Sequence, residues 1–355
     1  MKWVVPAGYK KEQIDWAGNI LVSNKPSKED FDKAFDILDN WRAIHGYPMH
    51  ALKNRIDRYL SIMDPEGFGA QRLKRFFAIY YKLDRSKRGI LRKLTLFQMQ
   101  DLGGCRAILS NVNFVKPFCD KCFLKAKTKH KLITNHDYIA KPRPSGYRGV
   151  HLVYQYFSDK PGKKEYSGLL IEIQIRSKLQ HLWATADETI GIFIDESIKS
   201  SEAKPEWLEF FKLVSSAFAL MEKCPLVENT PQDEKELYLM IKQKEAELEV
   251  IKKLKSWKRG IHETQELKKK GKFQYYLLEL NIPKEELSVT PFTEAERIKA
   301  IEKYAEIEKR NINKKEYNVV LVSADKTSDL QKTYTNYYGD TDEFVKVLTE
   351  IINKY

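Results

Sequence analysis

The sequence has little cysteine and no long apolar run. Only 4 of its 355 residues are cysteines, and they are spaced too unevenly for a disulfide framework. No run reaches the ~18 apolar residues that a membrane span needs. The first residues, MKWVVPAGYKKEQ, hold no apolar segment of signal-peptide length. We therefore expect a cytoplasmic protein that does not associate with a membrane.

The common phosphate-binding loops are also missing. Neither the P-loop pattern G-x-x-x-x-G-K-[ST] nor the dinucleotide pattern G-x-G-x-x-G occurs. Any phosphate must then be held by side chains. The sequence offers many, because its formal net charge is +13. A basic segment is usually a solvated face, but residues 71–100 carry nine basic residues against one acidic. This density favours a nucleotide or nucleic-acid partner.

Strands alternate with helices along most of the chain, which predicts a mixed sheet surrounded by helices. Residues 27–63 predict two helices, interrupted at 46–48 and capped by Ser27. Strands are expected at 105–110, 131–139, 150–157 and 168–176, followed by a helix at 177–193. Residues 228–257 read as a Lys/Glu-rich helical linker. Beyond it we expect strands at 273–283 and 317–325, a helix at 293–310 and a terminal helical hairpin at 329–355.

Cys119 and Cys122 form a C-x-x-C pair, with His130 and His136 downstream at distances compatible with zinc. The segment around them has apolar residues at 112, 115, 118, 119, 122 and 123, which is a helical stripe. One such pair is a weak metal signal. We therefore expect both thiols to pack on the buried face of a helix.

Two carboxylates are the best candidates for chemistry. Asp101 precedes the glycine pair that opens a buried strand, and Glu172 alternates with isoleucines in LIEIQIR. Such alternation often means only that one strand face meets solvent. Here the strand is so apolar that we expect it to be central, which makes its polar face a site. Paired carboxylates among Arg and Lys suit phosphoryl-type transfer with Mg²⁺.

Four blocks occur in order over residues 30–225: RLKRFFAIYYKLDR, DLGGCRAIL, GYRGVHLVY, and IEIQIR followed by HLWA. Together they resemble the synthetase domain of the RelA/SpoT family. The elements DNWRAIHGYP, VVLVSAD and YTNYYGDT resemble a branch of that family, the fused toxin and antitoxin phage-defence proteins of the CapRel type.

The resemblance implies an α+β fold: a nucleotidyltransferase-like mixed sheet flanked by helices, a helical linker and a small α+β antitoxin-like domain. The expected boundaries are 1–228 for the pyrophosphokinase domain, 229–272 for the linker and 273–355 for the C-terminal domain. It also implies transfer of pyrophosphate from ATP to a 3′-hydroxyl.

The resemblance also implies roles for individual residues. Asp101 and Glu172 would bind Mg²⁺, and Glu172 would also act as, or position, the base. The ATP would be held by Arg72, Lys74, Lys82, Arg85 and Arg106. Gln174 and Arg176 would support the strand face. We define the acceptor loop as residues 141–149. In this loop Tyr147 would stack on a base of the acceptor, and His151, just after the loop, would reach the acceptor. Arg143 and Arg148 of the loop are also expected to belong to the acceptor site.

The acceptor loop departs from the family pattern K-P-N-G-Y-x-S-x-H, because Arg143, Ser145 and Gly149 replace the Lys, Asn and Ser. These changes weaken the case for GDP or GTP as acceptor. CapRel-like members modify the 3′-terminal adenosine of tRNA, and the basic charge suits such a partner. We therefore predict pyrophosphate transfer to the tRNA 3′-CCA end, which would block translation.

The resemblance gives the C-terminal domain a regulatory role. Tyr334 and Tyr337, a Y-x-x-Y pair, would cover the ATP site and hold the enzyme inactive until a phage protein, typically the major capsid protein, binds. Packing on one helix face is the simpler explanation of that spacing.

Two other functions stay open. An RNA-binding module would need neither carboxylate. A small alarmone synthetase would make (p)ppGpp from ATP and GDP or GTP, with the C-terminal domain used for assembly.

Overall fold

The computed structural model describes residues 3–74, 76–87, 89, 93–194, 204–252, 254–255, 271, 273, 275–281, 286–311, 317–323 and 327–355. These residues form two compact units. The first unit comprises Met1–Tyr138 and Gly149–Lys178, and the second comprises Ile139–Arg148 and Leu179–Tyr355. The acceptor loop up to Arg148 therefore packs with the second unit. The domain boundaries predicted near residues 228 and 272 stay a prediction, because a division into compactly packed units is not the same as a division into functional domains.

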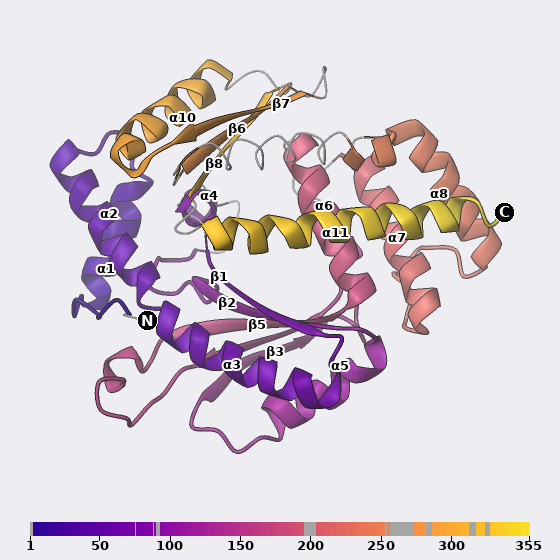
Figure 1. Ribbon diagram of the computed structural model, residues 1–355, viewed down its shortest axis with the longest axis horizontal. Coiled ribbons are helices and arrows are strands. Elements are labelled where there is room, and N and C mark those ends of the chain that lie inside the picture. Colours follow the sequence, from indigo (N-terminus) through magenta and orange to yellow (C-terminus); the bar gives the residue numbers. More distant parts are fainter. Residues whose placement is uncertain are drawn as a thin grey trace. The chain divides into compact units, whose positions relative to one another are not determined.

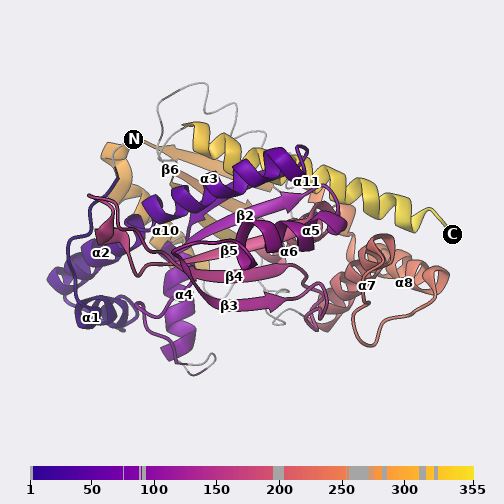
Figure 2. The ribbon, with the colours of Figure 1, turned by 90° about the horizontal axis from the view of Figure 1, so that it is seen from below.

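The first unit is built on a five-stranded sheet in the order β1-β2-β5-β4-β3 (Figures 1 and 2). Its strands are β1 (Phe68–Leu73), β2 (Gly103–Leu109), β3 (Lys131–Asp137), β4 (Val150–Gln155) and β5 (Leu170–Ser177). Only β2 and β5 pair in parallel, and the other three pairs are antiparallel. The predicted α+β class with a mixed sheet is confirmed, and so is the central place of β5.

One face of this sheet is apolar and covered by helices. Ile171, Ile173 and Ile175 of β5 are fully buried on it. The helices α3 (Gly46–Met63) and α5 (Val112–Cys119) contact the sheet (Figures 1 and 2). The approach of α3 is close, because the Cys105 thiol donates to the carbonyl of Met49 at 3.2 Å. Since side chains alternate along a strand, the residues between the isoleucines point to the opposite face.

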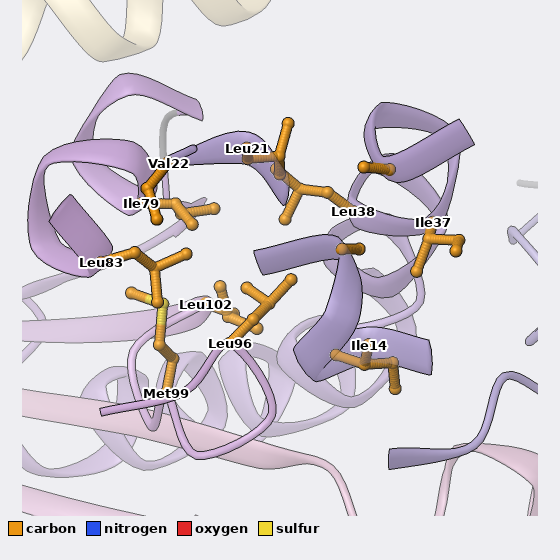
Figure 3. Close-up of a cluster of buried hydrophobic side chains, with 12 residues drawn as sticks. Ile14, Leu21, Val22, Ile37, Leu38, Ile79, Leu83, Leu96, Met99 and Leu102 are labelled. Atoms are coloured by element: carbon orange, nitrogen blue, oxygen red, sulfur yellow. The ribbon is translucent and has the colours of Figure 1, made fainter. Parts of the chain in front are cut away.

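Helices α1 (Lys11–Leu21), α2 (Lys28–Ala43) and α4 (Phe76–Lys87) share a second core (Figure 3). Ile79 and Leu83 anchor α4 in it beside Leu96, Met99 and Leu102 of the following loop. Burial of each such side chain stabilises the fold by about 2 kcal/mol. This core fixes the helix that carries Lys82 and Arg85.

The predicted helix signals at the N-terminus are confirmed. Ser27 caps α2, since its hydroxyl accepts from the backbone N–H of Asp30 at 3.0 Å. The break comes at residues 44–45, just before the predicted place, and α3 starts at Gly46. Pro48 falls in the first turn of α3, where its missing N–H leaves no helical bond unmade.

The cysteine segment is helical, as predicted. α5 runs into a π-helix, η1 (Asp120–Leu124), and Cys119 and Cys122 are 3% and 0% exposed. Burial raises the pKa of each thiol to about 12. Both therefore stay protonated and pack as small apolar side chains.

The second unit combines helices with a small sheet. Its helices are α6 (Lys178–Ile194), α7 (Pro205–Glu222), α8 (Glu234–Leu248), α10 (Arg297–Asn311) and α11 (Thr327–Ile352). The strands β6 (Tyr275–Asn281), β7 (Glu286–Phe292) and β8 (Tyr317–Ser323) pair antiparallel in the order β7-β6-β8. α10 packs on this sheet (Figure 1). β6, α10 and β8 confirm predicted elements.

The structure of this unit differs from the sequence prediction in two places. β7 was not predicted; its Pro291 is tolerated because β7 lies at the sheet edge. The terminal hairpin is instead one continuous helix, α11, with Gly339 inside it. Contacts just beyond the glycine offset its low helix propensity. Asp340 pairs with His181 of α6 at 2.8 Å, and Phe344 packs against Phe211 and Phe218 of α7.

The predicted linker contains α8, which packs tightly. Leu237 and Ile241 of α8 are fully buried, and α8 contacts both α7 and α11. Glu234, at the start of α8, accepts from the hydroxyl of Tyr355 at 2.8 Å. Across the described part of the chain, no helix has the length and apolarity needed to cross a membrane.

Candidate active site

The polar face of the five-stranded sheet carries several of the predicted residues of the first unit. Directly paired residues share a face, so the strand registers fix its rows. In one row Arg72 of β1 lies opposite Gly104 of β2, which lies opposite Glu172 of β5. In the next row Arg106, Gln174 and His151 stand side by side on β2, β5 and β4. Four strands thus place two arginines and one carboxylate on one surface.

Glu172 is held in a fixed orientation by two neighbours. His151 Nδ1 donates to Glu172 Oε1 at 3.0 Å, and Gln174 Nε2 donates to Glu172 Oε2 at 2.8 Å. The Glu172 side chain keeps 21% of its surface exposed. Each carboxylate oxygen can accept more than one hydrogen bond. The carboxylate can therefore still accept a proton from a hydroxyl that approaches from this face.

Gln174 is itself oriented by two arginines. Its Oε1 accepts from Arg106 Nε at 3.1 Å and from an Nη atom of Arg176 at 3.0 Å. With its oxygen held by cations, the amide must turn its nitrogen toward Glu172. Gln174 and Arg176, which is only 1% exposed, both belong to this chain of contacts, and their supporting role stays a prediction.

Asp101 lies just before β2 between two lysines. Lys74 Nζ and Lys82 Nζ are 2.8 and 2.9 Å from Asp101 Oδ2. Burial by itself raises the pKa of this carboxyl, but the two ammonium groups outweigh it and lower the pKa below its ordinary value. Asp101 is therefore ionised at neutral pH. Both lysines, predicted to grip ATP, contact the carboxylate here.

The polar face is open over Gly104, between Arg72 and Glu172. A Cβ built on Gly104 would meet only backbone oxygens of Glu172 and Arg72, at 3.8 and 4.0 Å. The missing side chain leaves a shallow space in the row. That space is bordered by a cation on one strand and a carboxylate on another, as a polyphosphate with a bound metal would require.

These residues fit a magnesium ion. Asp101 Oδ1 is buried and has no hydrogen-bond partner among the described residues, so it is an available carboxylate oxygen. No cluster of three or more Asp, Glu, His or Cys side chains is found in the described chain. Mg²⁺ is commonly bound through one or two carboxylates plus substrate phosphates and water. Asp101 and Glu172 would hold it, and the ion would neutralise charge on the phosphates.

The arrangement supports phosphoryl-type transfer by this chain's own groups. Glu172 can take the proton of an attacking hydroxyl, because both of its neighbours hold it without blocking the face. Arg72 and Arg106 are diagonal neighbours on β1 and β2, Lys74 and Lys82 contact Asp101, and Arg85 lies on the same helix as Lys82. Such cations can neutralise the charge of donor phosphates. All of these residues lie in one segment of the sequence.

That segment matches a known family. Residues 71–190 correspond to the model described as the region found in RelA / SpoT proteins. The match covers 120 of the 355 residues, and we call this matched segment the RelA/SpoT region.

Relatives of the RelA/SpoT region are known in Bacillus subtilis strain 168. The chain is 28% identical over 178 residues to the GTP pyrophosphokinase YwaC, covering 50% of this chain and 74% of YwaC. It is 30% identical over 110 residues to the GTP pyrophosphokinase YjbM, covering 31% of this chain and 50% of YjbM. A solved structure of small alarmone synthetase 1 from B. subtilis bound to its product pppGpp is 22% identical, with a TM-score of 0.43, and the match covers 52% of this chain and 92% of that one.

The acceptor loop of the RelA/SpoT region is arranged differently from the prediction. Tyr147 is 1% exposed, with its ring edge-on to Trp183 at 6.3 Å and the exposed Arg143 guanidinium 5.8 Å from the ring centre. A ring this buried presents no free face for a base. Arg148 is 3% exposed and also points inward, and burial lowers its pKa.

Ser215 of α7 fastens this loop, and no sequence pattern pointed to it. Its hydroxyl donates to the carbonyl of Gly146 at 2.6 Å and accepts from Arg148 Nε at 3.0 Å. The two Nη atoms of Arg148 have no hydrogen-bond partner among the described residues. Gly146 has φ +92°, and a Cβ on it would lie 2.9 Å from Ser215 Cβ. The loop and α7 are thus closely matched in shape and polarity.

Ser215→Ala is expected to destabilise the protein by about 1–3 kcal/mol, because it leaves a buried cation and a carbonyl without partners. It should also raise the KM for the acceptor and leave the KM for ATP unchanged. The matched control is Ser216→Ala, since Ser216 is equally buried but bonds to Thr230 and Val227. Thermal unfolding and steady-state kinetics measure both effects. An equal rise of acceptor KM in the two variants would show that general loosening of α7 is responsible.

The predicted Tyr334 and Tyr337 fall in the first half of α11. Their side chains lie outside the described residues, so their predicted role stays a prediction.

Proposed function

We propose that this chain transfers the β,γ-pyrophosphate of ATP to a 3′-hydroxyl, with the 3′-terminal adenosine of tRNA as its acceptor. The observation that carries the proposal is the polar sheet face of the RelA/SpoT region. There Glu172 is oriented by His151 and Gln174, among arginines that suit a polyphosphate. This is the arrangement that a pyrophosphokinase needs to deprotonate a hydroxyl and neutralise the transferred group.

The choice of acceptor rests on the sequence. Arg143, Ser145 and Gly149 depart from the guanine-nucleotide loop pattern, and the chain has a net charge of +13. A tRNA acceptor needs many distributed phosphate contacts, whereas a free nucleotide needs only a small pocket. Blocking the tRNA 3′ end would stop translation, and a cytoplasmic setting, where tRNA and ATP meet, belongs to this proposal.

A second candidate is synthesis of (p)ppGpp from ATP and GDP or GTP. It is favoured by the relatives YwaC and YjbM, which are GTP pyrophosphokinases. The two candidates share the donor and differ only in the nucleophile.

One assay separates the two candidates. The purified full chain is incubated with Mg²⁺, ATP labelled in its γ-phosphate, and deacylated tRNA, GDP or GTP. We expect label on the tRNA, lost after treatment with a nuclease that removes the 3′ end and absent when the tRNA is first oxidised with periodate. Label found only in ppGpp or pppGpp would exclude the tRNA reaction.

We further propose that the C-terminal part of the chain holds the enzyme inactive until a phage protein, the major capsid protein in our hypothesis, binds it. Tyr334→Ala or Tyr337→Ala in the full chain should then make expression toxic to growing cells, and adding Glu172→Gln should abolish the toxicity. Tyr355→Ala, which changes an exposed tyrosine of the same unit, is the control. Harmless growth with both variants would contradict the inhibitory role.

A further inference from the structure

Two aromatic rings lie at the edge of the polar face, on the far side of His151 from Glu172. His136 lies on the edge strand β3, directly opposite His151 of β4. Tyr138 follows β3, and its backbone N–H donates to the carbonyl of Gly149 at 3.0 Å. The row Arg106, Gln174 and His151 therefore continues to His136. Neither ring was singled out as part of the site from the sequence.

The rings are arranged as a continuous aromatic surface. The ring planes of His136 and Tyr138 are only 17° apart, with centroids separated by 5.7 Å. Tyr138 meets the ring of His151 nearly edge-on, at 5.4 Å and 76°. His151 in turn donates to Glu172 at 3.0 Å. One side chain therefore separates the aromatic pair from the carboxylate that would take the acceptor's proton.

The pair is accessible, whereas Tyr147 is not. His136 is exposed and Tyr138 is half-buried, while Tyr147 is 1% exposed. Accessible flat rings near the carboxylate that would act as base are suited to an unpaired base, because stacking on aromatic side chains is the main way that proteins hold single-stranded nucleotides. The base and the 3′-hydroxyl of an acceptor belong to the same nucleoside, so the base must rest close to Glu172.

We propose that His136 and Tyr138 form the stacking surface for the purine base of the acceptor nucleotide. This inference rests on the proposed function, since it requires a nucleotide acceptor. The base that we expect to stack there is the terminal adenine of tRNA. If GDP or GTP is the acceptor, the same rings would stack on its guanine. Stacking tolerates either purine, so the pair sets the position of the acceptor and leaves base identity to other contacts.

The test compares Tyr138→Leu, which removes the ring, with Tyr138→Phe, which keeps it. His136→Ala and His136→Phe make the corresponding pair on the strand. We expect each ring-removing variant to raise the KM for the acceptor about tenfold, with the KM for ATP and the thermal midpoint unchanged. Both phenylalanine variants should keep the wild-type KM. Phe157→Ala is the control, because Phe157 is also an exposed ring, 38% accessible, but follows the other end of β4.

A binding measurement gives a second readout that does not depend on turnover. A tRNA acceptor-stem minihelix with 2-aminopurine at its 3′ end should lose fluorescence on binding to the wild type and to Phe157→Ala, and keep most of it with Tyr138→Leu. An unchanged acceptor KM in both ring-removing variants, or quenching equal to wild type, would overturn the inference while transfer by the wild type persists. If the wild type labels none of tRNA, GDP and GTP, the proposed function fails first and the inference falls with it.

Discussion

Glu172→Gln is expected to reduce pyrophosphate transfer by about a thousandfold, the middle of the range for loss of a general base. Glutamine keeps the size of the side chain and can still meet His151 or Gln174, but it cannot take a proton. ATP binding should be unchanged, because the cations predicted to bind ATP lie on or just after β1, on β2 and on α4. Single-turnover transfer of labelled pyrophosphate, with calorimetric titration of a non-hydrolysable ATP analogue, separates the two effects.

The control for that substitution is Glu165→Gln, which changes the charge equally but lies in the short helix after β4. It should keep full activity. A Glu172→Gln enzyme that retains more than about a tenth of wild-type turnover would remove Glu172 from the role of base, since even weak general bases contribute about a hundredfold.

Asp101→Asn is the second large expected effect. We expect transfer to fall by at least about a hundredfold, in line with the loss of a group that stabilises transferring charge, and raised Mg²⁺ should restore part of it. The physical reason is that the variant loses a charged metal ligand and leaves Lys74 and Lys82 without their shared anion. Asp39→Asn is the matched control, because Asp39 forms a 3.1 Å ion pair with Arg42 on α2, away from the sheet. Loss of activity in both variants would point to a general charge effect.

The same ion pairs predict how stability depends on pH. The folded-state pKa of Asp101 is below its ordinary value of ~3.9, because the two lysines outweigh burial. The carboxylate therefore stabilises the fold fully above the ordinary pKa, and this contribution is lost as the pH falls through the lower folded-state pKa. Denaturant midpoints between pH 6 and pH 2 should fall less steeply for Asp101→Asn than for the wild type. Parallel curves would mean that the lysines do not hold the carboxylate in solution.

The sheet could be predicted from the sequence because the patterns that indicate its strands lie within short segments of the chain. Alternating isoleucines predicted that β5 is buried on one side, and the apolar strands around it predicted its central place. Ser27 marked the start of α2 through its capping preference, whereas the break expected at residues 46–48 lies at 44–45 and Gly46 is already helical. The polar face that carries Glu172 follows from the two-residue period of a strand, so its composition could be read directly.

The acceptor loop could not be predicted in the same way. Tyr147 packs against Trp183, and the neighbouring Gly146 accepts from Ser215; both partners lie in helices later in the chain, and no local pattern reports such packing. The ion pairs of Asp101 escaped prediction for a similar reason: Lys74 and Lys82 come from different elements and meet the carboxylate only in the folded sheet. The continuous α11 was missed because Gly339 is stabilised through the distant His181 and Phe211.

The packing of α11 has a practical consequence for studying the enzyme in pieces. A fragment ending at residue 228 would keep Phe211, Phe218 and His181 but lose Phe344 and Asp340, which bury them. Newly exposed aromatic surface of this kind promotes aggregation. An inactive truncated protein would then report poor solubility rather than the absence of catalytic groups, so single substitutions in the full chain are the informative route.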